Sequence, residues 1–196
     1  MGVLLGPIRV LKAVNDVLLR IGRAVAVAAL AIMVAVILAQ VFFRYVLNNA
    51  LPWPDEAARF MMLWMTGLIA PMAYRRGGFV AIDMLERALP PRVGAILSLV
   101  LLALSMAVLV MAARIGWSEV TGFGGSFATA SLWVPLSITF DEWLRVPRSW
   151  MMASLLVGLW LLILVNAELI LRQVAALMGA GAELPELMQT DLPEAE

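Results

Sequence analysis

The stretch that decides the fold is AVAVAALAIMVAVILAQVFF, residues 24–43, which contains no charged side chain. A helix needs about 20 consecutive apolar residues to cross the hydrocarbon core of a bilayer. Three further windows of mostly apolar residues follow at 57–74, 93–113 and 150–171. We therefore predict an all-α integral membrane protein with four transmembrane helices.

The composition of the whole chain agrees with a membrane location. Of its 196 residues, 63% are apolar and 14% are charged, against about 45–50% and about 25% in soluble domains. The chain has no cysteine and no histidine, which excludes disulfides, thiolate metal sites, histidine-ligated haem and serine–histidine dyads. The basic residues are scattered and form no patch for nucleic acid. We expect no catalytic residue, metal or cofactor in this chain.

The segments around the four spans are shorter or more polar. Residues 8–23 predict an amphipathic helix on the membrane surface, because charged residues recur there at helical spacing: Arg9, Lys12, Asp16, Arg20 and Arg23. A short interfacial helix is expected at about 79–89, and 118–149 is interpreted as a re-entrant or interfacial hairpin. The tail at 179–196 is acidic and expected to be poorly ordered, which leaves 1–178 as a single membrane domain.

The distribution of basic residues predicts the orientation. Nine lysines and arginines lie in the N-terminal segment, the 75–92 connection and the C-terminal segment, and five lie in the opposite connections. Because basic residues are retained on the cytoplasmic side, we expect both termini to be cytoplasmic. Five of the seven tryptophans then lie near the outer interface, as in an aromatic belt: Trp53, Trp117, Trp133, Trp143 and Trp150.

Few polar groups inside the spans could support chemistry. Glu168 has Arg172 four residues on, the spacing of an ion pair along one helix, although a proton or ion site is the alternative. Gln40 and Asn166 are single polar side chains, and we interpret them as interhelical hydrogen-bond formers. We find no pair of broken helices and no internal repeat of the kind that carriers use. The chain is therefore not expected to transport or catalyse alone.

One face of the first span carries small residues, namely Ala24, Ala28, Ala31, Ala35 and Ala39. Such a face lets another helix approach closely. Alanine is also simply common in apolar helices, and the sequence does not say whether a partner helix would belong to this chain.

The segment between the first two spans, FFRYVLNNALPWPDEAARF at 42–60, is rich in charged, amide and aromatic side chains. Asp55 is expected to cap the second helix, and Glu56 is expected to pair with Arg59. The alternatives are interfacial anchoring or a docking surface for a partner. Together with residues elsewhere, the structural or partner-interface candidates are Arg44, Asn48, Trp53, Asp55, Glu56, Arg59, Arg75, Arg76, Asp83, Trp133 and Glu168.

Two functions of other classes remain open from these residues. A small interfacial enzyme could use carboxylates such as Asp55, Glu56, Asp83 or Asp141 as acid–base or metal-binding groups. A homo-oligomeric channel could use a ring of Glu168 side chains.

The order of several motifs resembles a known family. Phe43-Arg44-Tyr45, then PWPDEAARF at 52–60 leading to Trp64, then RRGG at 75–78 and VAID at 80–83 resemble the DctQ-like small membrane subunit of tripartite ATP-independent periplasmic (TRAP) transporters. In two places the chain departs from the family pattern. Phe79 stands where the family often has a histidine, and a charged segment at 141–148 precedes the fourth span.

The resemblance implies a division of labour in a bacterial inner membrane. A periplasmic solute-binding protein captures an organic acid or similar anion, and a large many-span subunit carries it with sodium ions. The small subunit forms a heterodimer with the large one, braces it as a scaffold, contacts membrane lipids and helps to dock the binding protein. The resemblance implies no substrate-binding residue in this chain.

Overall fold

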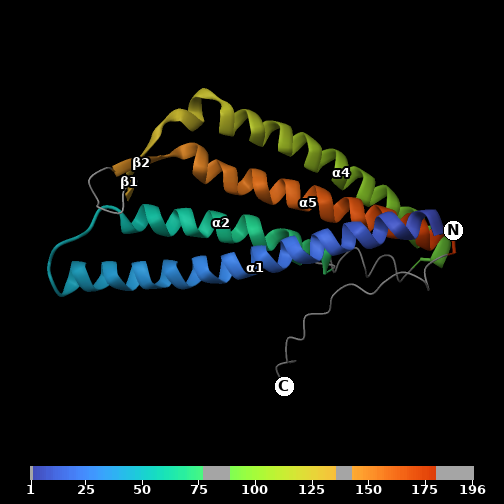
Figure 1. Ribbon diagram of the computed structural model, residues 1–196, viewed down its shortest axis with the longest axis horizontal. Coiled ribbons are helices and arrows are strands. Elements are labelled where there is room, and N and C mark those ends of the chain that lie inside the picture. The colour runs from blue at the N-terminus through green and yellow to red at the C-terminus, as the bar shows by residue number, and fades with distance from the viewer. Residues whose placement is uncertain (1, 77–88, 136–142, 180–196) are drawn as a thin grey trace, which may run out of the picture.

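The computed structural model describes residues 2–76, 89–135 and 143–179. Four long helices make up most of this part: α1 (Gly2–Tyr45), α2 (Pro54–Arg75), α4 (Pro91–Thr121) and α5 (Arg148–Leu177). Figure 1 shows them side by side in the order α1, α2, α5, α4. The N-terminal half of α1 also reaches the C-terminal end of α5, where Ile8 and Ala175 pack together fully buried.

Three of these helices are long and apolar enough, within the described residues, to cross a membrane: α1, α4 and α5. This agrees with the predicted membrane class and with three of the four expected spans. The fourth expected span, 57–74, lies in α2, whose apolar run is diluted by polar residues such as Arg59 and Thr66. α2 nevertheless packs along both α1 and α5 and lies between them in the row of four helices.

Prolines determine where three of the helices begin. Pro54 and Pro91 occupy first-turn positions of α2 and α4, and Pro147 directly precedes α5. Proline is favoured there because its fixed φ suits the helix and its missing N–H would have no partner. α2 begins one residue before Asp55 and has no side-chain cap, so the expectation that Asp55 caps this helix is wrong.

The first helix corrects another prediction. The amphipathic helix expected at 8–23 and the span expected at 24–43 form one continuous 44-residue helix, α1. Its buried seam follows a spacing of four and three residues through Asn15, Leu19, Gly22, Ala26 and Ala29. Gly22 does not break the helix, and a Cβ there would lie 3.5 Å from the Leu68 carbonyl oxygen of α2. Packing against α2 and α5 therefore carries the helix through the predicted boundary.

The stretch 118–149 contains short strands that sequence patterning does not predict. After α4 ends at Thr121, the chain forms a short 3₁₀ helix, η1 (Phe123–Ser126), and a two-stranded antiparallel hairpin, β1 (Ala128–Pro135) with β2 (Trp143–Pro147). This hairpin is the only departure from an all-helical fold in the described residues. The interfacial helix expected at about 79–89 falls almost wholly on residues outside those described, as does the tail from residue 180.

Candidate functional site

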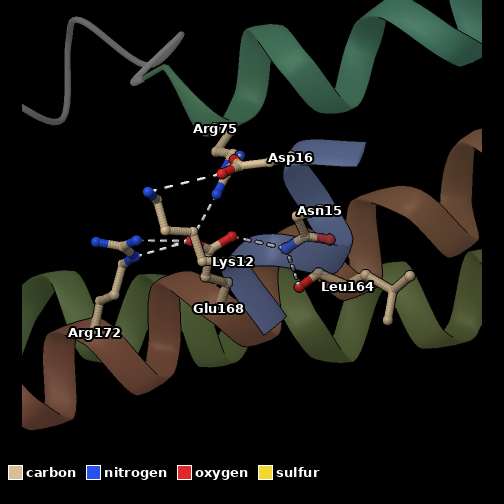
Figure 2. Close-up of polar contacts among 7 residues, drawn as sticks. All are labelled: Lys12, Asn15, Asp16, Arg75, Leu164, Glu168 and Arg172. Carbon is tan, nitrogen blue, oxygen red and sulfur yellow. Dashed lines mark hydrogen bonds and ion pairs between the residues drawn. The ribbon is translucent and has the colours of Figure 1, made fainter. Parts of the chain in front are cut away.

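A cluster of charged and amide side chains lies where the N-terminal half of α1 meets the end of α2 and the last turns of α5. Figure 2 shows its members pointing toward one another: Lys12, Asn15, Asp16, Arg75, Glu168 and Arg172. We call these six residues the polar cluster. Three helices that are distant in sequence contribute to it.

Glu168 is the centre of the polar cluster and is 0% exposed. Its carboxylate accepts hydrogen bonds from Asn15 Nδ2 at 2.7 Å, Arg75 Nη2 at 2.8 Å and Arg172 Nε at 3.0 Å. Asn15 Nδ2 also lies 3.3 Å from the carbonyl oxygen of Leu164. A buried carboxylate is costly unless charged donors satisfy it, and here donors from three helices do so.

Arg75 lies between two carboxylates. Its Nη1 pairs with Asp16 while its Nη2 pairs with Glu168, and its side chain is 7% exposed. Lys12 adds a longer contact, 3.7 Å from Nζ to Asp16 Oδ2. The polar cluster thus holds three cations and two carboxylates. Because an arginine guanidinium does not lose its proton in proteins, this arrangement suits a fixed cross-link better than a proton relay.

A second polar contact lies farther into the row of helices. Asn166 is 0% exposed; it accepts a hydrogen bond from the Tyr74 hydroxyl at 2.6 Å, and its Nδ2 donates to the Leu102 carbonyl oxygen at 3.0 Å. This confirms the interpretation of Asn166 as an interhelical hydrogen-bond former. Together with the polar cluster, the contact ties all four helices to one another.

The crossing of α2 and α5 depends on two glycines. A Cβ at Gly67 would lie 2.4 Å from the Ser154 carbonyl oxygen, and a Cβ at Gly158 would lie 2.7 Å from the Gly67 carbonyl oxygen. Both obstacles are backbone atoms, so any larger residue would push the helices apart. Such close approach is typical of small-residue contacts between membrane helices.

At the opposite end of the row, Glu56 in the first turn of α2 binds the hairpin. Its carboxylate accepts the Ser131 amide at 2.6 Å, the Ser131 hydroxyl at 2.7 Å and the Ala130 amide at 3.0 Å. Burial acts to raise the pKa of Glu56, but hydrogen bonds from Ser131 and from the amides of Ala130 and Leu132 outweigh it and hold the pKa below its ordinary 4.5. The expected Glu56–Arg59 ion pair does not form, because the hairpin occupies the carboxylate.

The hairpin has its own polar contacts. The Arg145 guanidinium lies 5.2 Å from the centroid of the Trp133 ring, across the strand pair, and its Nη2 donates to the Ala130 carbonyl oxygen at 2.7 Å. The hydroxyl of buried Thr129 donates to the Val146 carbonyl oxygen at 2.8 Å. These contacts join the two strands of the hairpin to each other.

The structure brings together only part of the predicted set of candidates. Arg75 and Glu168 meet in the polar cluster, and Glu56 binds the strand that carries Trp133. Asn48 adopts a left-handed turn with φ of 53° after α1. The other described candidates are exposed and distributed over both ends of α2 and the end of α1: Arg44, Trp53, Asp55, Arg59 and Arg76. Asp83 lies outside the described residues.

Sequence reasoning missed the α1 half of the polar cluster. The expected Glu168–Arg172 pair forms, with 2.9 Å between Arg172 Nη2 and Glu168 Oε1, but Arg75 and Asn15 also bind Glu168. The available signal was Asn15, a polar residue in the four-and-three spacing of an otherwise small or apolar seam. Lys12 and Asp16 belong to the charged face of the amphipathic helix predicted at 8–23, and the spacing of those charges gives no hint of a helix packed beside them.

The described residues contain no group of three or more aspartates, glutamates, histidines or cysteines placed to hold a metal ion. Nor does the polar cluster present an uncompensated carboxylate. The arrangement that the sequence builds is a set of buried cross-links between helices.

Comparison with known proteins supports the same family as the sequence motifs. The family model described as "Tripartite ATP-independent periplasmic transporters, DctQ component" matches residues 33–176, which include the C-terminal part of α1, all of α2 and α4, and all but the last residue of α5. No curated protein matches the chain. The matched region covers well over half of the chain, and the chain accordingly belongs to the DctQ family, the small membrane component of TRAP transporters.

Proposed function

We propose that this small component works as a rigid scaffold that braces the large transport subunit of its transporter. The observation that carries the proposal is Glu168, fully buried and bonded to donors from α1, α2 and α5. Cross-links of this kind favour helices that keep their relative positions while a partner moves. The glycine crossing of α2 and α5 supports the same conclusion.

The proposed topology has four membrane crossings with both termini in the cytoplasm of a bacterial cell. Its supports are the packing of α2 along α1 and α5, both apolar enough to span, and the excess of basic residues at one end. Most of the tryptophans predicted for the outer interface are exposed near the hairpin, which suits an aromatic belt there.

The large subunit is proposed to pack on the exposed side of α1. The alanine face predicted from the sequence, from Ala24 to Ala39, is exposed, while the seam toward α2 uses Ala26 and Ala29 instead. Within the described residues no helix of this chain covers the alanine face, so a helix from another subunit has room to approach closely.

Substrate and energy coupling are assigned to the partners. Sodium ions are proposed to bind in the large subunit, and an organic acid or similar anion is proposed as the solute, which the binding protein delivers. The exposed charges around the start of α2, including Asp55 and Arg59, are candidates for docking that protein. The support for these assignments is the family resemblance.

The two alternatives have less support in this geometry. A channel built on Glu168 needs its carboxylate to face a pore, whereas Glu168 binds Arg75, Arg172 and Asn15 inside the helix row. An enzyme using Glu56 needs a carboxylate that can take up a proton, whereas Glu56 accepts three hydrogen bonds from the hairpin.

The test is to purify the tagged chain from its native membranes in mild detergent and identify what accompanies it by intact mass. A stoichiometric larger membrane protein would support the scaffold, while recovery of the chain alone or as copies of itself would overturn it. Asp55→Ala and Arg59→Ala test the docking surface. If assembly and solute uptake stay unchanged in both variants, the docking assignment fails.

A further inference from the structure

The N-terminal half of α1 exposes two different rows of side chains. Arg9, Arg20 and Arg23 are exposed on one side, and the charged pair Lys12 and Asp16 shares that side. We call the three exposed arginines the arginine row; at 1.5 Å per residue it is about 21 Å long. On the other side of the buried seam, a row of large apolar residues is at least 43% exposed: Val10, Val14, Val17 and Ile21.

The apolar row continues into the membrane span. Val25 follows Ile21 at the same helical spacing and is also exposed, and from Ala24 onward the helix carries no charge until Arg44. The arginine row therefore ends where the hydrocarbon-spanning part of α1 begins. Arginine side chains at that depth keep their stems on apolar surface and hold their guanidinium groups among the lipid headgroups.

The neighbouring polar cluster adds to the positive charge. It contains three cations and two carboxylates, so it does not neutralise the arginine row beside it. In addition, Arg75 Nε is buried and has no hydrogen-bond partner among the described residues. Among the described residues at this end, basic side chains therefore outnumber acidic ones.

We propose that the arginine row is a binding surface for anionic phospholipid headgroups in the leaflet that meets the N-terminal half of α1. A guanidinium presents paired N–H donors to phosphate oxygens, and the arginine row starts at the point where the spanning part of α1 leaves the hydrocarbon core. Each basic residue near such a surface strengthens attraction to anionic lipid, by up to about fivefold. The inference rests on the membrane location of α1 and not on the identity of any partner subunit.

The test uses the full chain reconstituted in phosphatidylcholine vesicles with trace spin-labelled lipid, either phosphatidylglycerol or phosphatidylcholine. The electron paramagnetic resonance spectrum gives the fraction of each lipid held at the protein surface. We expect several-fold preference for phosphatidylglycerol at low salt, weaker at high salt because the contact is electrostatic. Equal association of the two lipids with the unaltered chain would overturn the proposal.

Matched variants locate the preference. Arg20→Gln with Arg23→Gln should reduce it by several-fold, whereas Arg114→Gln with Arg148→Gln removes the same charge from exposed sites at the other end and should leave it unchanged. Lysine at positions 20 and 23 should retain most of it, which separates lost charge from a damaged fold. The proposal would also be overturned if the preference for phosphatidylglycerol fell only in the Arg114→Gln, Arg148→Gln variant. It would be overturned as well if the Arg20→Gln, Arg23→Gln variant kept the full preference. Neither result bears on whether a large subunit co-purifies with the chain, so this proposal and the proposed function can fail separately.

Discussion

Glu168 is the residue whose replacement should cost most. In Glu168→Gln, Arg75 and Arg172 lose their shared buried carboxylate. Removing one partner of a buried ion pair typically costs about 3–5 kcal/mol, because the remaining charge is left uncompensated. We expect a clearly lower thermal midpoint by circular dichroism in detergent micelles.

Two control variants test whether the loss of stability comes from the buried ion pairs of Glu168. Glu119→Gln makes the same chemical change at an exposed position on α4 and should alter stability by less than about 0.5 kcal/mol. Combining Glu168→Gln with Arg75→Gln should recover part of the loss, because the two residues are coupled. If both single glutamate variants melt alike, Glu168 does not hold the helices together.

At Gly67 the close approach of α2 and α5 should leave no room for a side chain. Gly67→Ala places a methyl group 2.4 Å from the Ser154 carbonyl oxygen, and overpacking of this kind costs about 1–3 kcal/mol. Gly116→Ala is the matched control, since its methyl group meets Leu156 Cδ1 at an ordinary 3.5 Å. Replacing glycine by alanine raises helix propensity by a similar amount at both positions. A thermal midpoint that falls in Gly67→Ala and not in Gly116→Ala therefore reports the close contact between α2 and α5. Equal midpoints would contradict the close contact.

At the scale of elements, the hairpin should be held against α2 in a pH-dependent way. The pKa of Glu56 lies below 4.5 when the hairpin is docked. Docking is therefore fully stabilised above pH about 4.5, and the stabilisation falls as pH drops through the lower folded-state pKa. A nitroxide on a cysteine at exposed Val134 should become more mobile over that range.

The cysteine-free sequence makes this label specific. Glu56→Gln cannot titrate and should leave the label mobile at every pH, because an amide accepts these hydrogen bonds more weakly than a carboxylate. A Glu56→Gln variant that still loosens on acidification would show that another group controls the hairpin.

The elements differ in how well the sequence predicts them. Long apolar runs predict α1, α4 and α5, because membrane helices are identified by length and hydropathy alone. The continuity of α1 through Arg23 and the strands of the hairpin depend on contacts with distant residues, such as Leu68 beside Gly22 and Glu56 beside Ser131. Local patterns cannot report such contacts. For the same reason the Glu168–Arg172 pair was predictable, whereas Asn15 and Arg75 were not placed beside it.

At the scale of the whole molecule, the number of crossings can be measured with single cysteines. Gly6, Ala50, Gly124 and Met178 are exposed, and a Cβ at Gly6 or Gly124 meets nothing within 4 Å. With four crossings, a membrane-impermeant maleimide should label cysteines at positions 6 and 178 from one side of the membrane and at positions 50 and 124 from the other. If α2 does not cross, positions 6 and 178 will lie on opposite sides.

The unbroken length of α1 has a consequence for how its two halves meet the bilayer. Forty-four residues make a rod about 66 Å long, more than twice the hydrocarbon thickness of about 30 Å. Since no hinge separates its two halves, the tilt of the spanning half sets the angle at which the other half meets the leaflet. A thicker bilayer, which stands the span more upright, would lift the arginines away from the headgroups. The tilt of one helix thereby links the thickness of the bilayer to the contact between the arginine row and anionic lipid.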